Sequence, residues 1–295
     1  MITFALTEKN LLNQKFLKGM ISIIICSRLH ILPNWFKKNI ADTIGVEYEL
    51  IHVDNSEKKY TIFEAYAEGL SRSKFNCLCF MHDDLLFHTQ NWGKILIKHF
   101  NQNSNWGIIA CAGCKILRKT HALWSIPEYN AFNIIQTDIK HGSEQKVWQT
   151  ISQPEKVIAV DGMWICARRE VFEKVKFDTL NYTPAFHFYD LDFSMQVYQA
   201  GFDVVIVPDI LIEHLSLGSF EAEWLTNNKV FFKKWKKYLP VNLAGVDNKT
   251  MQNLEWKAFI SMLRYIKEYK AYYLFFDVLI RAFEVQIEYI FKKNK

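Results

Sequence analysis

The sequence predicts an α/β protein built on a mainly parallel β-sheet that is flanked by helices. First, apolar runs of strand length alternate with helical patterns, as in the strand–helix–strand series of residues 21–26, 34–44 and 47–53. Second, half of the 295 residues are apolar, and only 11 are Gly and 6 are Pro. A chain of this length and composition can bury a large core and contains little linker.

Each part of this first unit has its own signal. Residues 21–26 (ISIIIC) form a continuous β-branched run, which is typical of a strand that is buried on both faces. In the next segment Trp35, Ile40 and Ile44 fall at helical spacing, and Gly45 follows at a position that commonly ends helices. Residues 47–53 (EYELIHV) then predict the second strand.

The same alternation continues to residue 215. The further strands that we expect are residues 76–81, 106–112, 157–160, 163–167, 204–207 and 210–215. The further helices that we expect are residues 61–70, 92–100, one that begins at Arg169, and 188–200, which Gly201 ends. Residues 113–155 are irregular and polar, and there we expect a hairpin or a loop over the site.

Polar side chains follow three of the expected strands where each strand ends. These residues are Ser27 and Arg28, Asp54 and Asn55, and His82, Asp83 and Asp84. In open α/β sheets ligands bind at the carboxyl ends of the strands, so we expect the three groups to converge on one cleft. The cluster in FMHDDLLF (residues 80–87) stands at the mouth of a core strand, where such residues rarely occur without a ligand.

The net charge is +5, and the basic excess lies in the C-terminal quarter. Residues 221–295 hold 14 Lys and Arg against 8 Asp and Glu, whereas residues 1–220 hold 22 against 23. The core contains no basic recognition motif, so nucleic-acid binding is not expected. Six cysteines, mostly within apolar runs, favour a reduced, cytoplasmic protein. The sequence predicts neither a secretory signal nor a membrane span.

Five segments in order carry a resemblance to a known family. They are ISIIICSR, ELIHVDNS, CLCFMHDD, AVDGMWICARREVF and FHFYDLDFSMQVYQAGFDVVIVPDILIEHLS. Together they resemble the nucleotide-sugar glycosyltransferases of GT-A fold, in particular glycosyltransferase family 2, over residues 20–220. The resemblance implies a GT-A (Rossmann-like) mixed, mainly parallel sheet and an inverting, metal-dependent transfer from a nucleoside-diphosphate sugar.

The resemblance implies a metal site around the acidic cluster. The family's Asp-x-Asp motif aligns with His82, Asp83 and Asp84, so Asp84 is the expected ligand of Mn²⁺ or Mg²⁺, and His82 or Asp83 faces the ribose or the metal. His214 matches a family histidine that completes the metal shell. Imidazole suits Mn²⁺ better than Mg²⁺. The alternatives are an acidic pair that caps a turn and a structural histidine.

The remaining binding residues also follow from the resemblance. Asp54 and Asn55 match a position that contacts the base or ribose, and Ser27 and Arg28 border the same pocket. Alternatively, Asp54 and Asn55 form an Asx-turn. Asp161 and Gly162 match a segment that contacts the donor sugar or the acceptor. Trp124, Trp148 and Trp164 offer stacking surfaces for a sugar ring, and the alternative for each is packing in the core.

The resemblance places the catalytic base at Asp190. In the family an acidic residue of a Glu-Asp pair activates the acceptor hydroxyl, and here Tyr189 stands in place of the glutamate. Direct displacement needs a base opposite the leaving diphosphate. We expect the helix N-terminus to lower the pKa of Asp190 and keep it ionised. The alternative is that Asp190 or Asp192 only caps the helix.

The C-terminal quarter falls outside the resemblance. We divide the chain into an N-terminal extension (1–19), a catalytic domain (20–220) and a helical, basic and aromatic extension (221–295). The last helix carries Asp277, Arg281, Glu284 and Glu288 on one stripe of an apolar cylinder, so we expect it to be buried nearly all round. It packs on the domain, forms a homodimer, or lies in a membrane interface.

We therefore expect an enzyme that transfers a sugar from a nucleoside-diphosphate sugar to a saccharide or lipid-linked acceptor. The expected setting is the synthesis of a bacterial surface polysaccharide or glycoconjugate, in the cytoplasm or at the inner face of the membrane. His82 and Tyr189 depart from the family pattern, which leaves a catalytically silent nucleotide-sugar-binding module as one alternative. A carboxylate-dependent hydrolase is the other.

Overall fold

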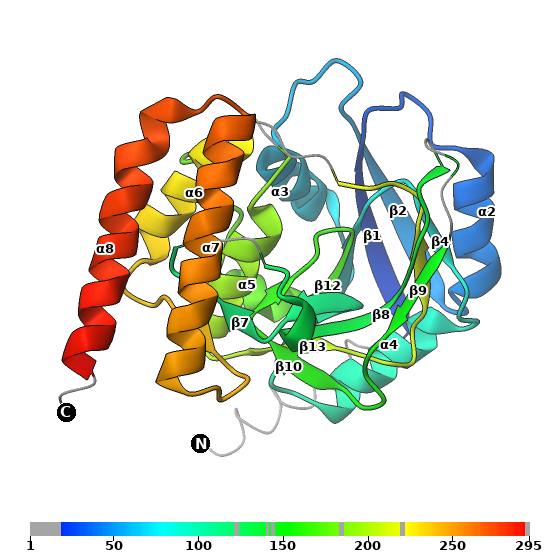
Figure 1. Cartoon of the computed structure of the whole chain (residues 1–295). Coiled ribbons are helices and arrows are strands. Elements are labelled where there is room, and N and C mark those ends of the chain that lie inside the picture. Colours follow the sequence, from blue (N-terminus) through cyan, green and yellow to red (C-terminus); the bar gives the residue numbers. More distant parts are fainter. Residues whose placement is uncertain are drawn as a thin grey trace, which may run out of the picture.

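The structure is a computed structural model that describes residues 19–120, 124–139, 142, 145–182, 186–218 and 222–292, with side chains to residue 289. A seven-stranded sheet with the order β10-β13-β5-β12-β3-β1-β2 lies at its centre (Figure 1). The strands are β1 (Met20–Ser27), β2 (Glu47–Asp54), β3 (Cys77–Met81), β5 (Trp106–Ala110), β10 (Glu155–Val157), β12 (Trp164–Arg168) and β13 (Asp203–Ile206). Strands β10 and β12 run antiparallel to their neighbours and the other pairs are parallel. The predicted mixed, mainly parallel sheet is therefore confirmed.

Helices cover both faces of this sheet. Ile24 of β1 packs in one apolar cluster with residues of α3 (Ile62–Arg72) and α5 (Tyr189–Gln199). Its neighbours Ile23 and Ile25 pack in the other cluster, with residues of α2 (Asn34–Thr43) and α4 (Trp92–Gln102). Successive side chains of a strand point to opposite faces, so a strand between two helical layers must be apolar at every position. The run ISIIIC meets this requirement except at Ser22, which is buried and whose hydroxyl group donates to Glu49 at 2.6 Å.

A second sheet packs beside the first and has the order β11-β6-β8-β14-β4, with β9 paired to β8. Its strands are β4 (Leu85–Phe87), β6 (Ala112–Cys114), β8 (Asn130–Gln136), β9 (Lys146–Gln149), β11 (Ala159–Val160) and β14 (Ile212–His214). Strands β8 and β9 form the expected hairpin, but the expectation of an otherwise irregular excursion is wrong. Buried Asn133 interrupts the apolar pattern of β8, and its amide donates to the carbonyl oxygens of Pro208 and Ile210 at 2.9 and 2.8 Å.

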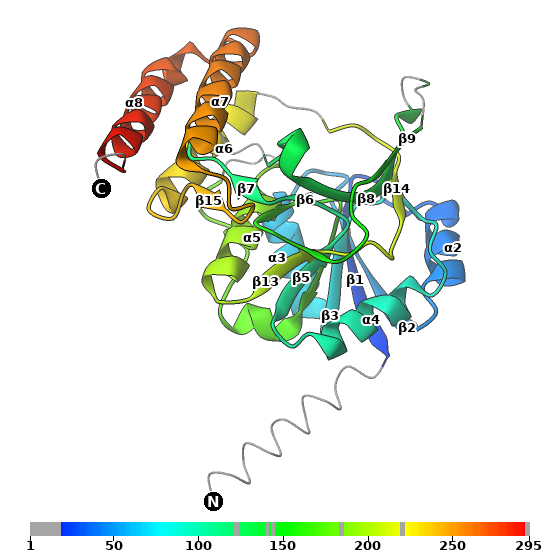
Figure 2. The same ribbon diagram turned by 60° about the horizontal axis from the view of Figure 1, so that its bottom comes forward.

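The C-terminal segment adds three helices: α6 (Ala222–Trp235), α7 (Asn248–Glu268) and α8 (Phe275–Lys292). Between them β15 (Val241–Asn242) pairs with β7 (Ile116–Leu117) in a separate two-stranded sheet, and β7 follows β6 of the second sheet closely in the chain. Figure 2 shows α7 and α8 side by side at the end of the molecule where β7 and β15 lie. The proposed division at residue 220 stays a prediction, and the extension 1–19 lies outside the described residues except for Gly19.

Two expectations about helices are corrected. The helix expected from Arg169 is only a short 3₁₀ helix, Arg169–Glu173, and the other 3₁₀ segments are Pro127–Tyr129 and Tyr272–Leu274. Helix α8 is not buried all round, because Phe276, Ile280 and Phe283 are exposed while Arg281 of the charged stripe is buried. Among the helices that the structure describes, none is both long enough and apolar enough to cross a membrane.

Candidate active site

The cluster His82–Asp84 lies where the chain passes from the first sheet to the second. It follows β3 and precedes β4, and the backbone N–H of His82 donates to the carbonyl oxygen of Met163 at 2.9 Å. On the other side, the N–H of Leu215 donates to the carbonyl oxygen of Asp84 at 3.0 Å. The antiparallel register of β4 and β14 pairs Leu85 with His214. This pairing brings the side chain of His214 beside that of Asp84, although 130 positions of sequence separate them.

His82, Asp84 and His214 form a group that can hold a metal ion, which we call the His–Asp–His group. One ligand atom of each residue lies within 4.8 Å of the other two. Oδ1 of Asp84 is 3.5 Å from Nε2 of His214 and 3.9 Å from Nδ1 of His82. Within the described chain, Asp84 Oδ1 and His214 Nε2 are buried without a hydrogen bond. Buried polar atoms are normally paired, and two imidazoles with a carboxylate suit Mn²⁺, so the residues fit a divalent cation.

The charges of the group are mutually dependent. Burial disfavours the charged form of each residue, but the pKa of Asp84 is held well below its usual range by the neighbouring His214 and His82. The pKa of His214 is raised, because Asp84 outweighs the effect of burial. Burial and the neighbouring His214 lower the pKa of His82. The group therefore favours one ionised carboxylate, and a cation bound there displaces any proton on His214.

Tyr189 positions the ring of His82. The Tyr189 hydroxyl group lies 2.9 Å from Nε2 of His82, which leaves Nδ1 on the side of Asp84. Gly162 makes room for Tyr189, since a Cβ at residue 162 would lie 2.0 Å from the tyrosine oxygen. Histidines that bind metals usually engage their second nitrogen in this way. The sequence shows Tyr189 only as a departure from the family pattern, and its role becomes visible in the folded chain.

A cavity of about 240 Å³, the β1 cavity, opens beside the His–Asp–His group. It is lined by Cys26, Arg28, Ile62, His82, Asp83, Asp84, Phe186 and Tyr189. The Ser27 hydroxyl group donates to Asp83, and the guanidinium of Arg28 lies 4.9 Å from the centre of the Phe186 ring. The ends of β1 and β3 therefore converge as predicted, and the guanidinium group of Arg28 lines the same cavity as the acidic cluster.

The end of β2 lies next to the end of β1, but Asp54 and Asn55 line neither this cavity nor the one that adjoins it, so the expected convergence does not extend to them. Asp54 accepts from the backbone N–H of Ser56 at 2.9 Å, and its Oδ2 is 2.6 Å from Nδ1 of His30. These contacts hold the pKa of Asp54 below its usual range, with the Ser56 bonds as the main cause. Asn55 is buried and exchanges two hydrogen bonds with the backbone of Tyr60, both 2.9 Å long. The Asx-turn alternative is thus present, and binding of a base or ribose by Asp54 or Asn55 stays a prediction.

A second cavity of about 210 Å³, the α5 cavity, adjoins the first at His82, Phe186 and Tyr189. Among the residues that line it are Asp161, Gly162, Asp190, His214, Trp124 and Trp224. The Asp190 carboxylate accepts from the N–H of Leu191 at 2.8 Å at the start of α5. The expected base and the His–Asp–His group therefore face a common space.

The expectation that the helix N-terminus keeps the pKa of Asp190 low is wrong. The surrounding protein removes water from the carboxyl group, and the nearby Asp161 adds a like charge, so the pKa of Asp190 rises to about 7. Backbone N–H groups of Leu191 and Gly162 act in the opposite direction but are outweighed. A carboxyl group that titrates near neutral pH can accept a proton and later release it.

Other expected side chains serve the core. Trp164 is fully buried and packs edge-on against Trp92, with ring centres 6.2 Å apart, so it is not a surface for a sugar. Trp124 lines the α5 cavity, whereas Trp148 lies half-exposed on β9. Asp192 is buried and accepts from the side chains of Tyr182 at 2.9 Å and Trp235 at 2.8 Å, so its hydrogen bonds serve packing rather than the cap of its helix.

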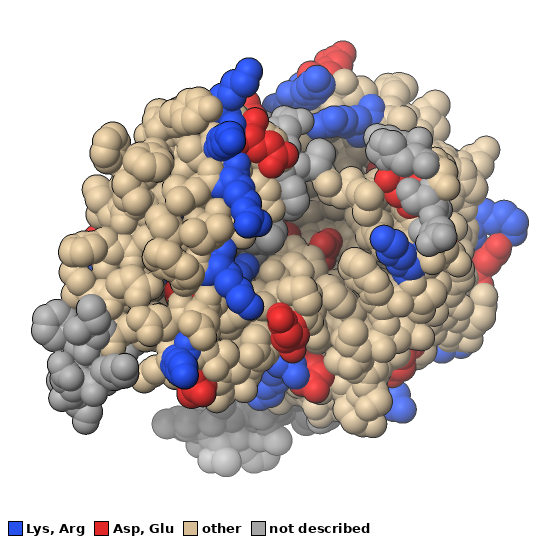
Figure 3. All heavy atoms as spheres, viewed as in Figure 1, with Lys and Arg blue, Asp and Glu red and all other residues tan. Residues whose placement is uncertain are grey.

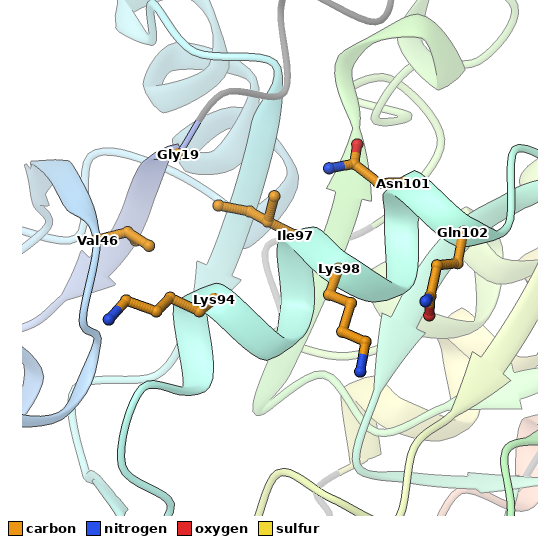
Figure 4. A pocket seen from close by; sticks show the side chains of 7 residues that line it. All are labelled: Gly19, Val46, Lys94, Ile97, Lys98, Asn101 and Gln102. Atoms are coloured by element: carbon orange, nitrogen blue, oxygen red, sulfur yellow. The ribbon is translucent and has the colours of Figure 1, made fainter.

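Another hollow lies far from this chemistry. Figure 4 shows it between α4 and the beginnings of β1 and β2, lined by Gly19, Val46, Lys94, Ile97, Lys98, Asn101 and Gln102. β1 begins there and ends at the β1 cavity, so the hollow lies at the opposite end of that strand. It contains no acidic or nucleophilic group.

Comparisons with known proteins agree with this architecture. The crystal structure of GalNAc-T7 with UDP, GalNAc and Mn²⁺ matches with a TM-score of 0.50 and 14% identity. The match covers 74% of this chain and 49% of that one, so this chain spans about half the length of GalNAc-T7. A second solved structure, A197 from STIV, matches more weakly, with a TM-score of 0.39 and 14% identity. This match covers 67% of this chain and 85% of that one. No curated protein matches. The fold is that of the GT-A glycosyltransferases.

A family model identifies the family of this chain, whereas solved structures at 14% identity show only its fold. The model described as "Glycosyltransferase like family" matches residues 19–243, which include both sheets, the His–Asp–His group and Asp190. The match covers most of the chain and extends into the C-terminal segment. This chain belongs to that glycosyltransferase-like family.

Proposed function

We propose that the protein is an inverting, metal-dependent glycosyltransferase that uses a nucleoside-diphosphate sugar. The observation that carries this proposal is the placement of the His–Asp–His group and Asp190 around adjoining cavities. A cation-binding group on one side and a titratable carboxyl group on the other match the two needs of a direct displacement. The GT-A fold and the family membership support the same reaction class.

In the proposed step, the Asp190 carboxylate takes the proton of the acceptor hydroxyl group. The acceptor oxygen forms a bond to the anomeric carbon as the bond from that carbon to the diphosphate oxygen breaks. Arg28, which lines the β1 cavity, stabilises the negative charge on the departing nucleoside diphosphate. His82, Asp84 and His214 would hold a divalent cation, Mn²⁺ in preference to Mg²⁺, which when bound would supply further neutralisation of the diphosphate charge.

We assign the nucleoside to the β1 cavity and the acceptor to the α5 cavity. Arg28 and Asp83 line the first cavity, Ser27 donates to Asp83, and Asp54 ends the neighbouring strand β2. Asp161 and Gly162 line the second cavity. The acceptor that we propose is a saccharide or a lipid-linked saccharide, in the synthesis of a bacterial surface polysaccharide or glycoconjugate. We place the reaction in the cytoplasm, which agrees with the six cysteines, all of them free thiols.

The proposal is tested with a panel of nucleoside-diphosphate sugars and acceptors, with Mn²⁺, with Mg²⁺ and with a chelator. We expect release of nucleoside diphosphate that depends on both the acceptor and the metal, and a product of inverted anomeric configuration. Metal-dependent nucleotide binding without turnover across the panel would identify a silent binding module. Release of free sugar at a rate indifferent to the acceptor would identify a hydrolase.

A further inference from the structure

Helix α8 carries two apolar faces, and the residues that the structure describes cover only one of them. Val278, Ala282, Val285 and Tyr289 are buried against the rest of the molecule. On the opposite side Phe276, Ile280 and Phe283, which are 75%, 60% and 68% exposed, form with Ile287 a row at positions i, i+4, i+7 and i+11. We call this row the apolar stripe. Exposed apolar rows of this kind commonly mark a contact surface.

Three of the four charged side chains that the structure describes on α8 contact neighbouring segments and not the apolar stripe. Arg281 is buried and donates to Asp277 at 2.6 Å and to Asn228 at 2.7 Å. Glu288 pairs with Lys119, and of the acidic side chains of this helix only Glu284 is exposed. Asp277, Arg281 and Glu288 thus attach the helix to its neighbours, and Glu284, one turn after Ile280, is the exposed charge at the margin of the apolar stripe.

A row of cations runs along the neighbouring helix α7. Gln252 of α7 donates to Gln286 of α8 at 2.7 Å, so the two helices pack directly against each other. The exposed basic residues on and just after α7, which we call the basic row, are Lys249, Lys257, Arg264, Lys267 and Lys270. Figure 3 shows Lys and Arg side chains aligned over α7, next to the uncharged surface over α8.

We infer that this pair of helices docks on an anionic lipid surface. The apolar stripe enters the boundary between headgroups and acyl chains, and the basic row meets the lipid phosphates, with both helices parallel to the membrane plane. Trp256 of α7 and Tyr272 and Tyr273, which precede α8, are exposed and belong to the residue types that favour this boundary. The contact is peripheral, in agreement with the absence of a described helix that could span a bilayer.

The charges favour a lipid surface over a second copy of the chain. From residue 247 to residue 289 the exposed charged residues comprise the basic row against Asp247, Glu268 and Glu284. A twofold dimer over the apolar stripe brings two such mainly basic margins to one interface, where like charges repel. An anionic bilayer offers the opposite charge along the whole row.

This inference goes beyond the proposed transfer reaction and does not depend on it. The surface is nevertheless close to the site, because Trp224 of α6 lines the α5 cavity and also lies edge-on to Tyr265 of α7 at 5.7 Å between ring centres. Docking through α7 and α8 therefore holds the α5 cavity near the lipid surface.

Vesicle co-sedimentation tests the inference with the full chain. We expect the protein to sediment with phosphatidylcholine vesicles that contain phosphatidylglycerol, to bind pure phosphatidylcholine far more weakly, and to dissociate at high salt. The double variant Ile280→Ser/Phe283→Ser is expected to lower the partition coefficient at least about tenfold. The double variant Lys257→Glu/Arg264→Glu is expected to reduce binding to the pure phosphatidylcholine level.

Matched controls come from other parts of the surface. Leu180→Ser/Ile31→Ser removes two apolar side chains that are 87% and 72% exposed outside these helices, and Lys94→Glu reverses a charge on α4. Both are expected to bind vesicles like the unchanged protein. Circular dichroism checks that every variant folds, and the single variant Phe276→Ser provides a milder change at the same stripe.

Two kinds of result would overturn the inference. One is equal binding by the stripe variants and the controls, or no binding to anionic vesicles at all. The other is a dimer in light scattering that Phe283→Ser separates into monomers without any vesicle binding, which assigns the stripe to a second copy. Nucleotide binding measured on the same samples reports on the transfer site separately, so failure of the lipid contact is distinct from failure of the proposed function.

Discussion

The hydroxyl group of Tyr189 lies 2.9 Å from Nε2 of His82, so the first residue of α5 orients a member of the His–Asp–His group at the end of β3. Both residues depart from the pattern of family 2, which has an aspartate and a glutamate at these positions. The two departures are in contact with each other. A carboxylate needs no ring orientation, whereas an imidazole does, and Tyr189 provides it.

Removing this hydroxyl group tests the relationship. We expect Tyr189→Phe to weaken Mn²⁺-dependent binding of a nucleoside diphosphate about 10- to 100-fold, because the His82 ring loses its partner. Isothermal titration with and without Mn²⁺ measures the change. Affinity in the absence of metal serves as the internal control and should stay the same. Equal weakening under both conditions would show that Tyr189 only supports the shape of the cavity.

The His–Asp–His group predicts a pH-dependent affinity for Mn²⁺. Asp84 raises the pKa of His214, so the histidine carries a proton over more of the neutral range, and a cation must displace this proton. We expect the affinity for Mn²⁺ to fall as the pH drops through the His214 titration. Asp84→Asn should lose most of the affinity at every pH. Electron paramagnetic resonance of free Mn²⁺ measures both, and a pH-independent affinity would contradict this assignment.

The raised pKa of Asp190 predicts how the rate of the proposed reaction depends on pH. Because burial and Asp161 raise the pKa of Asp190 to about 7, the base loses its charge below neutral pH, and kcat should fall about tenfold for each pH unit below that value. We expect Asp190→Asn to lower kcat by about 10²- to 10⁴-fold and to leave nucleotide affinity nearly unchanged. Normal transfer by this variant would remove Asp190 from the role of base.

The same substitution should stabilise the fold above neutral pH. The pKa of Asp190 is raised to about 7 in the folded state, so folding favours the protonated carboxyl group, and stability is lost as the pH rises through this value. A neutral Asn avoids this loss. We expect Asp190→Asn to raise the free energy of unfolding by about 1–3 kcal/mol at pH 8.5 relative to its effect at pH 4. Urea unfolding at the two pH values checks the difference, and no pH dependence would contradict the raised pKa.

Asp192 should contribute strongly to the free energy of unfolding. Its buried carboxylate accepts hydrogen bonds from Tyr182 and Trp235 and pairs with Lys234 at 2.8 Å. Asp192→Ala leaves these donors without a partner, and we expect a loss of about 3–5 kcal/mol in urea unfolding. Asp42→Ala removes the exposed pair with Lys38 and should cost less than about 0.5 kcal/mol. Similar losses for the two variants would argue against the buried network.

The sequence predicts those parts of the site that lie directly at the ends of recognisable strands. Ser27 and Asp83 end neighbouring strands, and buried apolar runs mark those strands clearly, so their contact could be predicted. The pKa of Asp190 could not, because its main causes are burial and Asp161, which lies 29 positions earlier. Local signals such as a helix N-terminus are visible in sequence, whereas a like charge from another strand end is not.

The full extent of the second sheet could not be predicted from the sequence, for a similar reason. Asn133 reads as a loop residue because its partners, the carbonyl groups of Pro208 and Ile210, come from a distant segment. The exposed face of α8 was missed because an apolar helix with one charged stripe suggests burial everywhere else. In the structure the charged stripe is what attaches α8, through Arg281 and Asn228, and an apolar face remains outside.

The two aspartates of α5 have a consequence for protein engineering. Asp190 faces the cavity and Asp192, half a turn further on, faces Lys234 and Trp235 of α6. Any chimera that exchanges the C-terminal helices among relatives must therefore retain this lysine and tryptophan, or a replacement for both. Otherwise the graft removes the contacts that anchor α5, the helix that carries the proposed base, and a variant designed to change the acceptor would lose its activity instead.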